Sequence, residues 1–147
     1  MNAAVGRRLL AEFTGTGLLV AIVVGSGIAA TRLTTDGALQ LLVNSLVTAM
    51  GLAVLIVVFI QAGGAHFNPV VTAADWLLGR HTPRRYSLGQ AAAVMACQIA
   101  GAIAGAALAD AILLWDPADR TLIAANIVGT WLATTGVTRV TVATPDP

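Results

Sequence analysis

Long apolar runs separated by short polar segments are the main pattern along this chain. Three of these runs cover residues 9–30, 38–60 and 88–114. Each is long enough to cross a bilayer, because a helix rises roughly 1.5 Å per residue and the hydrocarbon core is about 30 Å thick. A fourth run, at residues 121–138, is more polar and is only a marginal span. The pattern predicts an all-α, polytopic membrane protein with three to four transmembrane helices.

A shorter apolar segment, residues 68–78, lies between the second and third runs. Asn68 is a strong N-cap residue, and Pro69 suits the first helical position, where its missing N–H costs no hydrogen bond. A helix of this length rises about 16 Å, which is roughly half of a hydrocarbon core. Asn-Pro also starts ordinary turns, but its place between two apolar runs favours a re-entrant half-helix. Lipid tolerates such backbone only where it is buried in protein or faces a watery cavity.

Composition supports a membrane protein and narrows the chemistry. Of the 147 residues, 57% are hydrophobic and 10% are charged, whereas about a quarter are charged in an average soluble domain. The net charge of +1 is too small to indicate a nucleic-acid partner. The single cysteine, Cys97, is interpreted as a small buried apolar residue. We find no nucleophile with a basic partner, phosphate loop or metal-ligand cluster, and we therefore expect no enzyme activity, cofactor or metal.

The start of the predicted half-helix resembles the first Asn-Pro-Ala motif of the aquaporin and glycerol-facilitator family, the major intrinsic proteins. The segment reads Gly64, Ala65, His66, Phe67, Asn68, Pro69, Val70, Val71, Thr72. Eight of its nine positions fit the family pattern, and the exception is Val70, where the family usually has alanine. Residues 11–16 and 98–102 resemble the family's first and third helices. The resemblance runs from residue 8 to residue 114 and implies a single membrane domain, residues 1–147, with half of an aquaporin-like fold.

This resemblance implies a channel for passive movement of water or small uncharged solutes. A helix N-terminus carries about half a positive charge. At mid-membrane, the helix end at Asn68 would repel cations, while the Asn68 amide could donate to a passing oxygen. Carbonyl groups of Gly64, Ala65 and His66 would accept hydrogen bonds on the approach. His66 has two interpretations, a structural anchor for the loop or a polar group lining the pathway.

Two polar residues inside the apolar spans are candidates for buried support. Glu12 lies within the first span, where an ionisable group should face the protein interior and find a partner. The resemblance implies that its carboxylate helps to hold the re-entrant loop; the alternative is a carboxylate that reaches interfacial water. Gln98 belongs to the third-helix segment. Gly101 and Gly105 form a GxxxG pattern, which allows close packing in a dimer or, as we favour, against the half-helix.

Arginine positions predict the orientation of the chain. If there are four spans, six arginines fall on one side and two on the other. The positive-inside rule then places both termini in the cytoplasm. Residues 125–130 share the form Ala, three residues, Gly-Thr with residues 11–16, so residues 121–138 are a possible start of an inverted second repeat.

The expected partners follow from this organisation. They are the lipid bilayer, a small neutral solute, and either further copies in a homo-oligomer or a complementary half. A family channel has two half-helices, whereas we find one Asn-Pro motif of this kind in the sequence. The alternative function is therefore a truncated, non-conducting membrane or interaction protein that needs a partner half.

Overall fold

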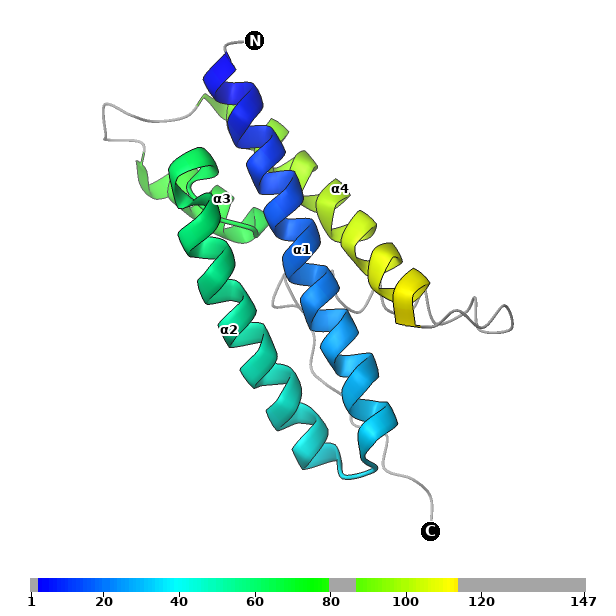
Figure 1. The fold of residues 1–147 in the computed structure, drawn as a ribbon. Helices are drawn as coiled ribbons and strands as arrows, with labels where there is room; N and C mark the ends of the chain where they lie inside the picture. Colours follow the sequence, from blue (N-terminus) through cyan, green and yellow to red (C-terminus); the bar gives the residue numbers. More distant parts are fainter. Residues whose placement is uncertain (1–2, 80–86, 114–147) are drawn as a thin grey trace, which may run out of the picture.

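The computed structural model describes residues 3–79 and 87–113, and four α-helices make up most of this part (Figure 1). They are α1 (Ala3–Leu33), α2 (Gly37–Gly63), α3 (Pro69–Leu78) and α4 (Leu88–Leu113). The described residues contain no strand. α1, α2 and α4 are each long and apolar enough to cross a membrane, and α3 is a shorter apolar helix. The predicted all-α membrane fold is confirmed; the marginal span at 121–138 lies outside the described residues.

The ends of α2 follow directly from the local sequence. Asp36 caps its start, because Oδ1 accepts hydrogen bonds from the N–H groups of Ala38 and Leu39 at 2.8 and 3.2 Å. The residue after the helix, Gly64, is its C-cap: its φ of +92° is left-handed and its N–H donates to the Ile60 carbonyl at 3.2 Å. Glycine adopts this conformation without steric cost. The chain therefore turns sharply out of α2 just before the Asn-Pro pair.

α1 lies between α2 and α4, and α3 packs against α4 (Figure 1). α1 begins at the same end of the bundle at which α2 ends and α4 begins. Asn44 joins the first two helices, because its Nδ2 donates to the Val23 carbonyl at 2.8 Å and to Ser26 Oγ at 3.0 Å. The loop that leads into α3 is therefore brought beside the first half of α1, although the two are far apart in the sequence.

Gly101 and Gly105 bring α4 into close contact with α1. A Cβ at Gly101 would overlap the carbonyl oxygen of Phe13, and a Cβ at Gly105 would overlap that of Gly17. The GxxxG pattern serves packing within the chain, and the helix that it packs against is α1. The prediction that it packs against the half-helix was wrong. Gly17 is itself a small residue on α1, so two helix backbones can approach each other there.

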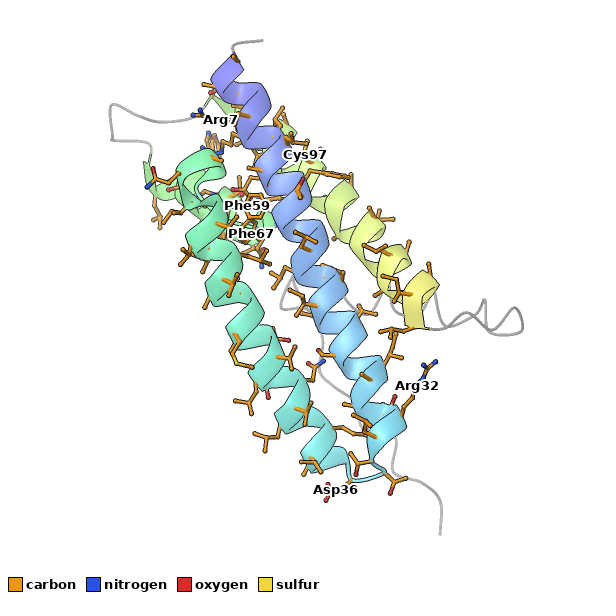
Figure 2. All side chains as sticks on the ribbon, viewed as in Figure 1. Arg7, Arg32, Asp36, Phe59, Phe67 and Cys97 are labelled. Atoms are coloured by element: carbon orange, nitrogen blue, oxygen red, sulfur yellow. The ribbon has the colours of Figure 1, made fainter. Side chains whose placement is uncertain are left out.

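The outer surface of α2 remains apolar and open in the described structure. Side chains on this helix that are more than half exposed include Leu41, Met50, Val54, Val57 and Val58. Figure 2 shows side chains projecting outward along the length of α2. In a membrane protein, such a surface contacts lipid or other protein segments rather than water.

Candidate functional site

α3 begins at the Asn-Pro pair, as predicted. Asn68 has an extended backbone, and its Oδ1 accepts a hydrogen bond from the N–H of Val70 at 2.8 Å. Pro69 is the first helical residue, and the N–H of Thr72 donates to the Asn68 carbonyl at 3.1 Å. The Asn68 side chain therefore satisfies one of the amides that a helix start leaves without a partner in its own helix. The helix has 10 residues, a length of about 15 Å.

The backbone leading into α3 is held in an uncommon conformation. Gly64, Ala65 and Phe67 have φ values of +92°, +56° and +50°. For a residue with a side chain, the left-handed region costs on the order of 1–3 kcal/mol and persists only where surrounding contacts impose it. Two such residues within three positions indicate that other parts of the protein hold this loop in place.

Glu12 of α1 supplies those contacts. The residue is 0% exposed, and its two carboxylate oxygens accept hydrogen bonds from successive backbone N–H groups. Oε1 accepts from His66 at 3.0 Å and Oε2 accepts from Phe67 at 2.8 Å. The carboxylate lies in the interior of the described structure, which disagrees with the alternative in which it reaches interfacial water. A buried charge with two backbone donors is a strong anchor, because charge-assisted hydrogen bonds are stronger than neutral ones.

The same two bonds orient the carbonyl groups of the loop. All described peptide bonds are trans, so the C=O of each peptide plane points opposite to its N–H. Since the N–H groups of His66 and Phe67 face Glu12, the carbonyls of Ala65 and His66 point away from Glu12. Two acceptors are therefore presented on the opposite side of the loop, in the segment predicted to offer carbonyl groups to a solute.

Gln98 and Thr72 extend this anchor across three helices. Gln98 Nε2, on α4, donates to Glu12 Oε2 at 2.8 Å and to Thr72 Oγ1, on α3, at 2.9 Å. All three side chains are buried. Buried polar groups with satisfied partners fix one arrangement, because breaking the network would leave several of them without partners.

Thr72 is a site residue that sequence reasoning did not single out. It lies on the first turn of α3, and its backbone N–H donates to the carbonyl of the cap residue Asn68 at 3.1 Å. The sequence signal available for it was its place at the end of the segment that carries the family resemblance.

Phe67 adds an apolar contact to the polar anchor. The residue is 2% exposed, and its ring meets that of Phe59 edge to face, with 6.0 Å between ring centroids (Figure 2). Gly15 of α1 makes room for this ring, because a Cβ at position 15 would overlap it. Neither Phe67 nor Gly15 was singled out as a site residue, although both lie in the segments that carry the family resemblance.

His66 is held by α3 but remains partly accessible. Its Nδ1 lies 3.1 Å from Thr72 Oγ1, and its Nε2 lies 3.8 Å from Asp75 Oδ2. The side chain is 15% exposed. The geometry is compatible with both interpretations of His66, because one ring nitrogen contacts the anchor while the residue keeps some exposed surface.

Val70 and Gly64 lie at the open side of the site. Val70 is 50% exposed, so much of its surface is available for contact from outside the described residues. Gly64 lines a cavity of about 390 Å³ between the ends of α1, α2 and α4, together with Arg8, Gln61 and Gln90. The lining of this cavity is mostly apolar, and these three side chains are its polar members. The described residues contain no cluster of side chains suited to a metal ion.

Comparison with known proteins agrees with the resemblance in the sequence. The family model for the major intrinsic proteins matches residues 2–142. Aquaglyceroporin AqpS of Rhizobium meliloti (strain 1021) is 45% identical over 127 residues, which are 86% of this chain and 52% of that protein. Aquaporin-3 of Milnesium tardigradum is 34% identical over 131 residues, 85% of this chain and 40% of that protein. The chain therefore spans about half the length, or less, of these two relatives.

Proposed function

Because this chain belongs to the major intrinsic protein family, we propose that it forms part of a membrane channel through which water or small uncharged solutes move passively. The observation that carries this proposal is the N-terminus of α3, capped by Asn68 and held by Glu12 through the preceding loop. The protein is integral to the membrane, with three helices suited to span it. The family consists of channels rather than enzymes, in agreement with the expected lack of catalytic machinery.

The field at the start of α3 suits a neutral solute. Unpaired amides at a helix N-terminus carry about half a positive charge, which repels cations at close range. Asn68 Oδ1 caps the helix, so the donor end of the same amide, Nδ2, is the part that would meet a passing oxygen. The carbonyls of Ala65 and His66 point away from Glu12 and would accept hydrogen bonds from the same solute. Donors and acceptors that follow one another along a pathway replace the hydrogen bonds that a polar, uncharged molecule makes with water.

The orientation in the membrane is part of the proposal. Arg7 lies at one end of α1 and Arg32 at the other (Figure 2). α4 begins at the same end as α1 (Figure 1), and the sequence just before α4, residues 80–85, contains three more arginines. The positive-inside rule assigns this end to the cytoplasm. α3 would then enter from the cytoplasmic side. Cysteines introduced at positions 80 to 85 should be labelled from the cytoplasm; labelling from outside would reverse the assignment.

We also propose that a complementary half completes the pathway. The described residues supply one half-helix N-terminus, and inverted repeats in membrane transporters place a second one opposite it. Val70 is half exposed on the first turn of α3, so its side chain is available for contact with such a second half. A further segment, a different chain or an inverted copy of this chain would each supply such a half.

Stopped-flow light scattering of proteoliposomes tests the channel proposal. The full chain is reconstituted alone and together with the part of Aquaglyceroporin AqpS that it does not match. We expect water or glycerol flux above that of empty liposomes in the mixed preparation. Asn68→Asp is the matched variant, because aspartate caps a helix as well as asparagine does but places a negative charge at the helix end. We expect it to abolish the additional flux. Flux equal to that of empty liposomes in both preparations would favour the non-conducting alternative.

A further inference from the structure

We propose that Thr72 is a positioning residue that fixes the tautomer of His66, so that the ring offers its Nε2–H to the oxygen of a neutral solute. The tautomer is inferred from the hydrogen-bond network around Glu12 alone. The claim that a solute accepts the hydrogen bond from Nε2–H rests on the proposed channel function. Each of these two parts has its own measurement below.

The direction of the network is set at Glu12. An ionised carboxylate only accepts hydrogen bonds, so the Gln98 amide must turn its nitrogen, not its oxygen, toward Glu12. The observed distance of 2.8 Å from Gln98 Nε2 to Glu12 Oε2 agrees with this orientation. The second hydrogen of the same nitrogen faces Thr72 Oγ1 at 2.9 Å. Both amide hydrogens of Gln98 are therefore used, and the Thr72 oxygen acts as an acceptor.

The hydroxyl hydrogen of Thr72 then has two acceptors within reach. One is Gln98 Oε1 at 3.2 Å and the other is His66 Nδ1 at 3.1 Å. A hydroxyl that already accepts from the nitrogen of one amide cannot also donate to the oxygen of that amide with good alignment, because both atoms belong to one small planar group. The geometry therefore favours donation from Thr72 to His66 Nδ1.

The tautomer of His66 follows from this donation. A neutral imidazole has one donor nitrogen and one acceptor nitrogen, and the hydrogen bond at one nitrogen decides which is which. Since Nδ1 accepts from Thr72, the proton must be on Nε2. The direction of hydrogen bonding that is set at Glu12 is thus passed through Gln98 and Thr72 to the His66 ring.

The Nε2–H group is placed where a solute could reach it. It lies 3.8 Å from Asp75 Oδ2, too far for a direct hydrogen bond. The structure shows no hydrogen-bond partner for Nε2 among residues 3–79 and 87–113. The His66 side chain is 15% exposed and that of Asp75 is 48% exposed, so the two groups face a partly open space. A hydroxyl group or water could accept from Nε2–H there and donate to the carboxylate.

Nitrogen NMR of the ring tests the tautomer in the full chain. The protein is labelled with ¹⁵N-histidine in detergent or nanodiscs, with His81→Gln to leave a single histidine, and measured where the ring is neutral. We expect a protonated Nε2 and an unprotonated, hydrogen-bonded Nδ1. In Thr72→Val the Nδ1 signal should shift toward that of a nitrogen without a donor, and Thr72→Ser should restore it. A protonated Nδ1 in the parent protein, or an unchanged Nδ1 signal in Thr72→Val, would overturn the proposal.

A matched control separates this effect from general loosening of the fold. Thr16 of α1 is also a buried threonine, and its hydroxyl has no hydrogen-bond partner within the described part of the chain. Thr16→Val should leave both ring signals of His66 in place. If Thr72→Val does not fold, Thr72→Ala removes the same hydroxyl and should shift the Nδ1 signal in the same way. An unchanged Nδ1 signal in Thr72→Ala would overturn the proposal.

The solute acceptor is tested separately from the tautomer. Flux through the mixed proteoliposomes should fall in Thr72→Val and recover in Thr72→Ser. If the ring signal depends on Thr72 but no flux is seen, the proposed tautomer stands and the channel proposal is rejected. If the ring signal shifts in Thr72→Val but the flux stays normal, the channel proposal stands. His66 Nε2–H is then rejected as a donor to the solute.

Discussion

Glu12 Oε2 lies 2.8 Å from the backbone nitrogen of Phe67, which follows it in the chain by 55 residues. With the bond from the His66 N–H to Oε1, this contact fixes two successive peptide planes of the loop before α3. The same side chain therefore stabilises the fold and decides which way the loop carbonyls face. A change at Glu12 should affect both properties together.

Glu12→Gln is the first test of this anchor. Glutamine keeps one acceptor oxygen but turns an NH₂ group toward a backbone N–H, which leaves a buried donor unsatisfied. We expect a loss of about 1–3 kcal/mol in the free energy of unfolding, as for other buried unsatisfied groups, measured by denaturation in detergent. Asp75→Asn is the control, since it also removes one negative charge but from a carboxylate that is 48% exposed. Equal stability of Glu12→Gln and the parent protein would contradict the anchor.

Asn68→Ala tests the cap of α3. Alanine cannot accept the hydrogen bond from the Val70 N–H, and no bulk water is expected at mid-membrane to replace it. We expect a loss on the order of 1 kcal/mol or more, seen as a lower melting temperature in detergent. Asn68→Asp should melt close to the parent protein, because aspartate retains an acceptor at the cap. An unchanged melting temperature in Asn68→Ala would count against a buried helix start.

The start of the half-helix was predictable because its causes are local. Asn68 and Pro69 occupy the two positions where their side chains favour a helix start, and the apolar runs on both sides give the membrane context. The buried role of Glu12 followed from the cost of a charge inside an apolar span. By contrast, no local pattern identifies the contact between Gly15 and Phe67, because it depends on how α1 and the loop meet in space. The partner of the GxxxG pattern was predicted wrongly for the same reason.

Gly105→Ala tests the packing of α4 on α1. The added methyl group would overlap the Gly17 carbonyl oxygen, and neither backbone can move without separating the helices. We expect a destabilisation of about 1–3 kcal/mol, as for other overpacked sites, measured by unfolding in detergent. Gly89→Ala, near the start of the same helix, is the control because its nearest neighbour would be a side-chain oxygen at 3.9 Å. Similar stabilities for the two variants would show that close backbone packing is not required.

Val70→Ala tests the position that departs from the family pattern. Val70 is half exposed on the first turn of α3, so its branched side chain is available to the complementary half. Alanine should let the two helix ends approach more closely and narrow the pathway. We expect the ratio of glycerol flux to water flux to fall in a two-half channel. The same ratio for valine and alanine would show that the departure is neutral.

The last prediction concerns the chain reconstituted alone. A parallel homo-oligomer would place every α3 on the cytoplasmic side, which leaves the outer half of each pathway without a facing half-helix. Inverted pairing requires some copies to insert upside down. If residues 121–138 form a fourth span, six arginines against two disfavour this dual topology. We therefore expect flux close to that of empty liposomes for the chain alone, and higher flux when a complementary half is present.

The stopped-flow comparison must include Asn68→Asp in both preparations. If the chain alone greatly accelerates water or glycerol flux and Asn68→Asp abolishes this, the chain makes a complete pathway without a separate half. Residues outside the described part, or an antiparallel pair of copies, would then have to supply the second wall. Crosslinking between cysteines at position 70 of two copies distinguishes these cases, because only an antiparallel pair brings two α3 N-termini together at the midplane.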